Sequence, residues 1–250
     1  MNPVTLFLIL TPLISLAIAL FLPLDPAIVV SLVAFVSALM AILLTATAEG
    51  RKGVIRLLQR LFRWRIGVKW YALALGLALG LQLAMSVLAL LLGWIPTIQV
   101  RASSFPELII LGVLILILSA GEELGWRGHV LPRLLARRPA LFSALLIGIP
   151  WGILHLGLIP GTGRPWLGTF LAPFGSSVVL TWLFIQTRGN LAMAILFHFG
   201  MNYFTFFNGG MTIADVVWSQ AIVTVALALI LIAVFGVNLQ RSPMRKPAMA

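Results

Sequence analysis

Long apolar runs of about 20 residues recur along the chain, separated by short polar connections. A run of this length crosses the hydrocarbon core of a bilayer when it is helical. None of the runs alternates with a period of two, as the strands of a membrane barrel do. The pattern therefore predicts an all-α membrane protein that folds as a single domain over 1–250. About eight transmembrane helices are expected, at 4–22, 27–48, 70–94, 108–126, 140–158, 169–187, 190–208 and 213–236.

The composition excludes the other broad classes of protein. Apolar residues make up 61% of the chain and charged residues 9%, whereas soluble domains average about 45–50% and about 25%. A chain of 250 residues cannot hide that much apolar surface from water. Soluble enzymes, disordered chains and coiled coils are thereby excluded. Cysteine is absent, which also excludes disulfides, thiolate metal sites and a cysteine nucleophile.

The net charge of +11 would favour nucleic acid binding in a soluble protein, but here the positions of the charges favour a membrane topology. With eight helices, all but two of the 17 Lys and Arg residues fall on one side of the membrane. They lie in the connections 49–69, 127–139 and 188–189 and in the C-terminal tail, and Arg101 and Arg164 are the exceptions. The positive-inside rule makes this side cytoplasmic. Both termini are therefore expected in the cytoplasm, and no nucleic acid partner is expected.

The segment 54–65 combines an apolar stripe with arginines. Leu57, Leu58, Leu61 and Phe62 share one side of a helical wheel, and the arginines lie elsewhere on it. This pattern predicts an amphipathic helix that lies at the interface with the anionic cytoplasmic leaflet.

Two adjacent acids lie more than three turns into the fourth predicted helix. Glu122 and Glu123 follow the run LIILGVLILILSAG. Ionisable groups at this depth are costly and indicate a functional site. Arg127 follows Glu123 by four residues, which favours an ion pair on one helix face. Because neighbouring residues diverge by about 100°, Glu122 is expected to face elsewhere and to be available for proton transfer.

Two of the three histidines also lie within predicted helices. His155 is late in the fifth helix and His198 is midway along the seventh, whereas His129 is near the cytoplasmic surface and is expected to be structural. Asn202 follows His198 by four residues and so shares its helix face. Together His198 and Asn202 could donate hydrogen bonds to a developing oxyanion. Counted from the cytoplasmic ends, His155 lies about 22 Å deep and His198 about 12 Å, so bent or tilted helices must bring them level.

Several catalytic patterns are missing from the sequence. It contains no H-E-x-x-H, no G-x-S-x-G and no phosphate-binding glycine loop. No second intramembrane aspartate is available to form an aspartyl dyad. These absences narrow the range of possible reactions.

Three short motifs in order resemble one family. They are Glu122-Glu123-x-x-x-Arg127, then Trp151-x-x-x-His155, then His198-x-x-x-Asn202. This set resembles the CPBP family of intramembrane endopeptidases, which includes the Rce1-type CAAX prenyl proteases and the bacteriocin-processing and self-immunity proteins called Abi. The resemblance covers 108–208, which is the expected catalytic core. Trp151 departs from the family pattern, in which this aromatic residue is usually Phe.

The resemblance implies a role for each motif residue. Glu122 would activate water, with His155 beside it. Glu123 and Arg127 would shape and neutralise the site, and His198 and Asn202 would stabilise the oxyanion. Members are often labelled metalloproteases, and Glu122, His155 and His198 would also suit a zinc ion with one position open for water. A metal-free site is favoured here, with zinc as the alternative.

The expected function is hydrolysis of a peptide bond near the cytoplasmic face of the membrane. The substrate would be a peptide or protein, with or without a lipid modification, of the CAAX or bacteriocin type. The protein itself would be an integral multi-pass protein of a bacterial or archaeal membrane. Two alternatives remain open at this point: a proton-coupled transporter that uses Glu122 and the histidines as relay groups, and a catalytically silent immunity or scaffold protein.

Overall fold

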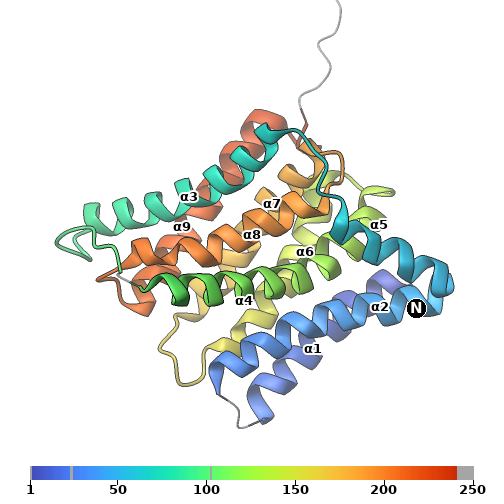
Figure 1. The fold of residues 1–250 in the computed structure, drawn as a ribbon, viewed down its shortest axis with the longest axis horizontal. Coiled ribbons are helices and arrows are strands. Elements are labelled where there is room, and N and C mark those ends of the chain that lie inside the picture. The colour runs from blue at the N-terminus through green and yellow to red at the C-terminus, as the bar shows by residue number, and fades with distance from the viewer. Residues whose placement is uncertain (1, 23–24, 102, 241–250) are drawn as a thin grey trace, which may run out of the picture.

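The computed structural model describes residues 2–22, 25–101 and 103–240. Within them the chain is all-α, as predicted, and β-pairing is confined to one isolated bridge between Gln99 and Gly209. The α-helices form a tilted bundle (Figure 1) and run as α1 Pro3–Phe21, α2 Pro26–Gln59, α3 Val68–Leu91, α4 Phe105–Glu123, α5 Leu131–Leu135, α6 Ala140–His155, α7 Trp166–Gln186, α8 Leu191–Tyr203 and α9 Ile213–Phe235. Short turns join some of them, namely η1 Arg60–Phe62, the π-helical η2 Leu124–Val130, η3 Leu156–Leu158 and η4 Phe204–Asn208.

Each of the eight predicted apolar segments corresponds to a helix. Seven helices of the described part are long and apolar enough to cross a membrane. The exception, α8, has 13 residues and is extended by the five residues of η4. At about 1.5 Å and about 2 Å per residue, the two together reach about 30 Å, the thickness of the hydrocarbon core. The multi-pass membrane fold predicted from the sequence is confirmed.

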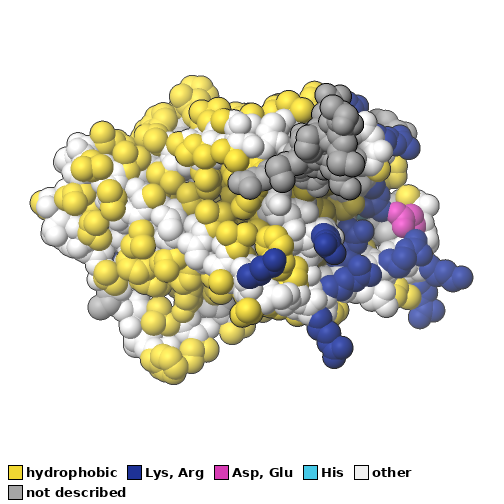
Figure 2. Space-filling model, turned by 90° about the horizontal axis from the view of Figure 1, so that it is seen from above, with side chains coloured by type: hydrophobic (Ala, Val, Ile, Leu, Met, Phe, Trp, Pro, Cys, Tyr) yellow, Lys and Arg dark blue, Asp and Glu magenta, His cyan; other side chains and the backbone are white. Residues whose placement is uncertain are grey.

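The helix α8 lies inside the bundle. It packs against α3, α4 and α7, and most of its side chains between Leu191 and Met201 are buried. By contrast, α1, α4 and α9 expose many large apolar side chains, and apolar surface covers much of the molecule in Figure 2. The chain therefore places its seventh predicted span in a protein environment and the outer helices against lipid.

The connections between the helices fall at two ends of the bundle, which we call the basic end and the opposite end. The basic end carries 49–69, 127–139 and 188–189, and the opposite end carries 92–104, 156–165 and 204–212. Figure 2 shows Lys and Arg side chains gathered over one end of the molecule. Three further cations that were assigned to this side from the sequence lie in the tail, outside the described residues: Arg241, Arg245 and Lys246.

The amphipathic segment 54–65 lies at the basic end, with most of its apolar stripe packed against the bundle. Gly50 has φ 63° and breaks α2, so that the second half of α2 folds back over the bundle. Leu57 is buried, and Leu58 and Leu61 pack against the same core, whereas Phe62 is 78% exposed. Most of the apolar stripe therefore contacts protein, because the turn at Gly50 directs it inward.

The helices α7 and α9 pack closely at Gly175. A Cβ atom on Gly175 would lie 2.8 Å from the backbone nitrogen of Val225 and 2.9 Å from the carbonyl carbon of Thr224. Gly175→Ala is therefore expected to force the helices apart and to destabilise the fold by about 1–3 kcal/mol. Thermal unfolding in detergent measures this. Gly76→Ala is the matched control, since Gly76 has no atom within 4 Å of the added Cβ, and an unfolding temperature lowered equally in both variants would contradict the expectation.

Candidate active site

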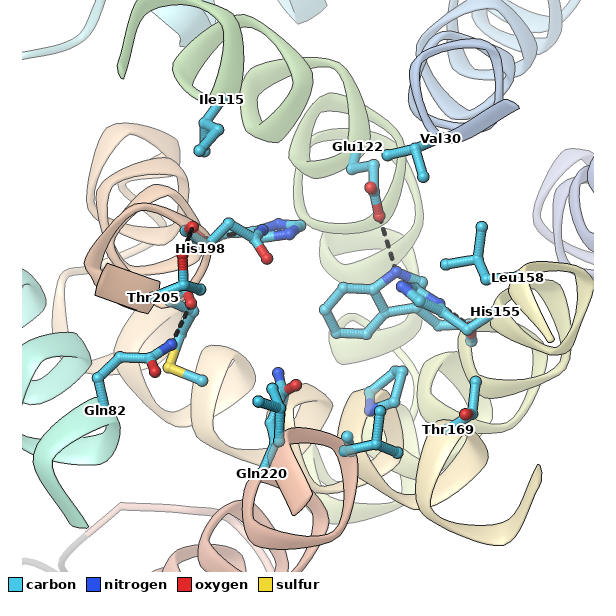
Figure 3. A pocket seen from close by; sticks show the side chains of 18 of the residues that line it. Val30, Gln82, Ile115, Glu122, His155, Leu158, Thr169, His198, Thr205 and Gln220 are labelled. Carbon is cyan, nitrogen blue, oxygen red and sulfur yellow. Dashed lines mark hydrogen bonds between the residues drawn. The ribbon is translucent and has the colours of Figure 1, made fainter. Parts of the chain in front are cut away.

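A cavity of about 340 Å³ extends through the bundle, lined by side chains of α2, α3, α4, α6, α7, α8 and α9. Figure 3 shows Glu122, His155 and His198 around this space, each from a different helix. Four of the six predicted site residues line it: Glu122, His155, His198 and Asn202. The other two, Glu123 and Arg127, are fully buried beside it.

The chain departs from regular α-helix directly after the two glutamates. The helix α4 ends at Glu123 and continues as the π-helical turn η2. Such turns recur at functional sites because they change the direction of side chains along a helix. Gly125 permits the turn to approach α2, since a Cβ atom there would lie 2.7 Å from the carbonyl oxygen of Ser37.

Glu123 is the centre of a buried charge cluster. Its Oε1 accepts from Arg127 Nη1 at 3.0 Å and from His198 Nδ1 at 2.9 Å. Neither the Glu123 nor the Arg127 side chain is exposed. The guanidinium carbon of Arg127 also lies 4.5 Å from the ring centroid of Trp151, a cation–π contact. The predicted ion pair is present, and it holds the ring of His198 in a fixed orientation.

Glu122 faces away from this cluster, as the helix geometry predicted. Its Oε2 accepts from the indole nitrogen Nε1 of Trp151 at 2.8 Å, the dashed line at Glu122 in Figure 3. Its other oxygen, Oε1, makes no hydrogen bond with the described residues. The hydrogen bond from Trp151 was not predicted from the sequence, although a buried indole N–H usually has an acceptor.

The two deep histidines meet at one indole ring. The rings of His155 and His198 both pack edge-on against Trp151, with centroids 5.7 Å and 5.6 Å from it. His155 Nδ1 lies 2.7 Å from the Trp151 carbonyl oxygen. Because a carbonyl only accepts, Nδ1 carries the proton and Nε2 is left as an acceptor. The difference in depth expected from residue counting is not seen, because both histidine rings contact the same indole.

Asn202 lies one turn beyond His198 on the same helix face. Its amide nitrogen donates to the His198 carbonyl oxygen at 3.4 Å, a long hydrogen bond within α8. The side chain is exposed to the cavity. The predicted pairing of His198 and Asn202 on one face is therefore present.

The three residues considered for zinc do not form a metal site in this arrangement. Among the described residues, no group of three or more His, Asp or Glu side chains is placed to hold a metal ion. The donor set Glu122, His155 and His198 thus does not fit a zinc ion here, and no step of the chemistry below passes through one.

Further polar side chains line the cavity that the sequence analysis did not select. Gln82 is buried midway along α3, donates to the Met201 carbonyl oxygen and accepts from Asn208 Nδ2 at 3.0 Å. Gln220 of α9 also faces the cavity (Figure 3). A glutamine within an apolar run was the signal for both. His129 lies outside the cavity, buried against Phe7 and Thr45.

The cavity extends away from the basic end. Its lining includes residues of the opposite end, among them Arg164, Thr205 and Asn208. The expectation was a site near the cytoplasmic face, which the charge rule places at the basic end. The lining thus favours an opening on the other side.

Comparison with known proteins supports the resemblance seen in the motifs. Residues 103–204 match the family described as type II CAAX prenyl endopeptidase Rce1-like. A curated relative, CAAX prenyl protease 2 of Methanococcus maripaludis, is 31% identical over 100 residues. The match covers 36% of this chain and 37% of the length of that relative. The predicted resemblance to Rce1-type proteins is confirmed over this region, which contains all six predicted site residues.

Proposed function

We propose that this protein is an intramembrane endopeptidase that uses Glu122 to activate water. The observation that carries the proposal is the meeting of Glu122, His155 and His198 around one cavity within apolar helices. A carboxylate, an imidazole acceptor and a hydrogen-bond donor pair are the groups that metal-free hydrolysis requires. The match of residues 103–204 to an endopeptidase family points the same way.

The attacking water would be held between Glu122 and His155. Glu122 Oε1 accepts one proton of the water as its oxygen attacks the carbonyl carbon of the substrate. His155 Nε2 accepts the other hydrogen bond, since Nδ1 is held by the Trp151 carbonyl. The proton on Glu122 then passes to the leaving amine as the C–N bond breaks. The products are a new carboxylate and a new amino terminus.

The negative charge of the tetrahedral intermediate would be stabilised by His198 and Asn202. With His198 Nδ1 bound to Glu123, Nε2 is the ring nitrogen left to donate to the oxyanion. Glu123 stabilises the positive charge on that ring, as a buried carboxylate does in a serine protease triad. Arg127 balances the charge of the Glu123 carboxylate.

The reaction type is tested by running peptide cleavage in water enriched in oxygen-18. The purified protein in liposomes is incubated with a mixed peptide library, and products are read by mass spectrometry. Hydrolysis predicts one heavy oxygen in each new carboxyl group. Peptides that remain intact, together with proton uptake driven by a solute gradient, would favour the proton-coupled carrier. Intact peptides without uptake would favour the silent scaffold.

A further inference from the structure

A second hollow joins the catalytic cavity at the opposite end of the bundle. Its volume is about 190 Å³. It shares five lining residues with the cavity that holds Glu122: Arg164, Thr205, Asn208, Val216 and Val217. The two hollows are therefore adjacent, and we call the outer one, lined by these five residues with Arg101, Met211 and Ile213, the mouth.

Among the described residues, the two cations that lie outside the basic end, Arg101 and Arg164, both line the mouth. Arg101 lines its outer part, and Arg164 lines both the mouth and the cavity that holds Glu122. Arg164 is half-buried and makes no ion pair with a described residue. Burial lowers the pKa of its guanidinium, and no carboxylate offsets this effect. A half-buried guanidinium without a counter-charge is costly unless an anion binds there.

The backbone holds Arg101 in place at the mouth. Its N–H donates to the Phe206 carbonyl oxygen at 2.8 Å, and Gln99 forms a β-bridge with Gly209. A Cβ atom on Gly209 would lie 2.6 Å from the Gln99 carbonyl oxygen, so the two strands of chain can approach only with glycine there. The acid Asp215 at the start of α9 accepts from the Thr212 N–H at 2.8 Å and makes no ion pair with a described residue.

We propose that Arg101 and Arg164 bind a carboxylate of the substrate peptide and so select which peptide bond reaches Glu122. The inference rests on the proposed function and adds a specificity determinant to it. A guanidinium binds a carboxylate through two parallel hydrogen bonds, which fixes direction as well as position. A peptide held in this way extends from the mouth along the cavity toward Glu122. The carboxylate is either the C-terminal group or an acidic side chain.

Binding and cleavage of four matched peptides test the proposal. They end in a free acid or an amide, and carry Glu or Gln near that end. Arg164→Gln is expected to raise KM for the carboxylate peptides by about 10- to 100-fold, as for a lost charge-assisted hydrogen bond, with kcat little changed. The peptide that is both amidated and Gln-containing should be unaffected. A preference for the free acid over the amide identifies the C-terminal carboxylate as the bound group, and a preference for Glu over Gln identifies the side-chain carboxylate.

Two variants serve as controls. Arg164→Lys keeps the charge and is expected to recover part of the affinity, whereas Arg51→Gln removes an exposed cation of the basic end and should change nothing. Equal effects of Arg164→Gln on acid and amide peptides would overturn the proposal. So would a variant that loses only its binding to phosphatidylglycerol vesicles, because a lipid phosphate would then be the ligand.

Binding to an inactive protein separates this proposal from the proposed function. Fluorescent acid and amide peptides are titrated against Glu122→Gln with and without Arg164→Gln. A preference for the acid that disappears with Arg164 supports the carboxylate site whether or not cleavage occurs. Cleavage that depends on Glu122 but lacks any acid preference would leave the endopeptidase standing and refute the site.

The side of entry follows from the same geometry. Since the basic end is cytoplasmic by the charge rule, the mouth faces the other side of the membrane. The chain has no cysteine, so single cysteines can be introduced directly, at Thr205 in the mouth and at Lys52 in the basic end. A membrane-impermeant maleimide is expected to label Thr205→Cys in intact cells and Lys52→Cys only after permeabilisation. The reverse pattern would overturn entry from this side.

Discussion

Glu122→Gln is expected to lower kcat for peptide hydrolysis by about 10³-fold, the usual contribution of a general base. The amide keeps the size of the carboxylate and still accepts from the Trp151 indole, but it cannot take a proton from water. Binding of substrate should change little, because Glu122 acts on the water and not on the peptide. The measurement is single-turnover cleavage of a defined peptide by purified protein in liposomes.

Glu107→Gln is the matched control for this prediction. Glu107 lies on the same helix α4, but it is exposed and completes a capping box with Ser104 at the N-terminus. Glutamine serves that position as well as glutamate. Unchanged activity in Glu107→Gln, together with a loss in Glu122→Gln, would show that the loss comes from the active site and not from a disturbed helix α4. Full activity in Glu122→Gln would refute its role as the base.

Arg127→Met is expected to have the largest effect on stability. It leaves Glu123, whose side chain has no exposed surface, with His198 alone as a partner. Removing one member of a buried ion pair typically costs about 3–5 kcal/mol. The unfolding temperature in detergent should fall by many degrees. The double variant Glu123→Gln with Arg127→Met should recover part of the loss, because no unpaired charge then remains.

A second Arg–Glu pair of the chain provides the control. Arg56 and Glu49 are also 3.0 Å apart, but the Arg56 side chain is 62% exposed. Exposed pairs contribute about 0–1 kcal/mol, so Arg56→Met should hardly change the unfolding temperature. Equal losses in Arg127→Met and Arg56→Met would mean that burial does not set the strength of the Glu123 pair.

The features that sequence reasoning predicted are local ones. Apolar runs of helix length located every span, because backbone N–H and C=O groups in lipid must bond to one another, which favours helices. The spacing of four residues predicted the pair of Glu123 and Arg127, and the divergence of neighbours predicted that Glu122 faces elsewhere. These conclusions need only the geometry of a single helix.

The features that it missed depend on contacts between distant segments. Trp151 and Glu122 are 29 residues apart, and nothing in either segment specifies that they meet. The fold-back of segment 54–65 depends on the positive φ of Gly50, which the helical pattern around it concealed. The direction of the cavity required the packing of seven helices. Arg101 and Arg164 were visible as cations on the unexpected side, and these two exceptions were the signal for the mouth.

The central claim is that Glu122 and His155 act on one water molecule in one cavity. A double-mutant cycle tests it most directly, with cleavage by Glu122→Gln, His155→Ala and the double variant read by mass spectrometry. Residues that act as a unit are strongly non-additive, so the double variant should be no more than about threefold slower than Glu122→Gln. Adding Arg164→Gln to Glu122→Gln should still raise KM, which would show that the assay can detect a further defect in the Glu122→Gln background. If the losses of Glu122→Gln and His155→Ala instead multiply, the two side chains act independently and the account is contradicted.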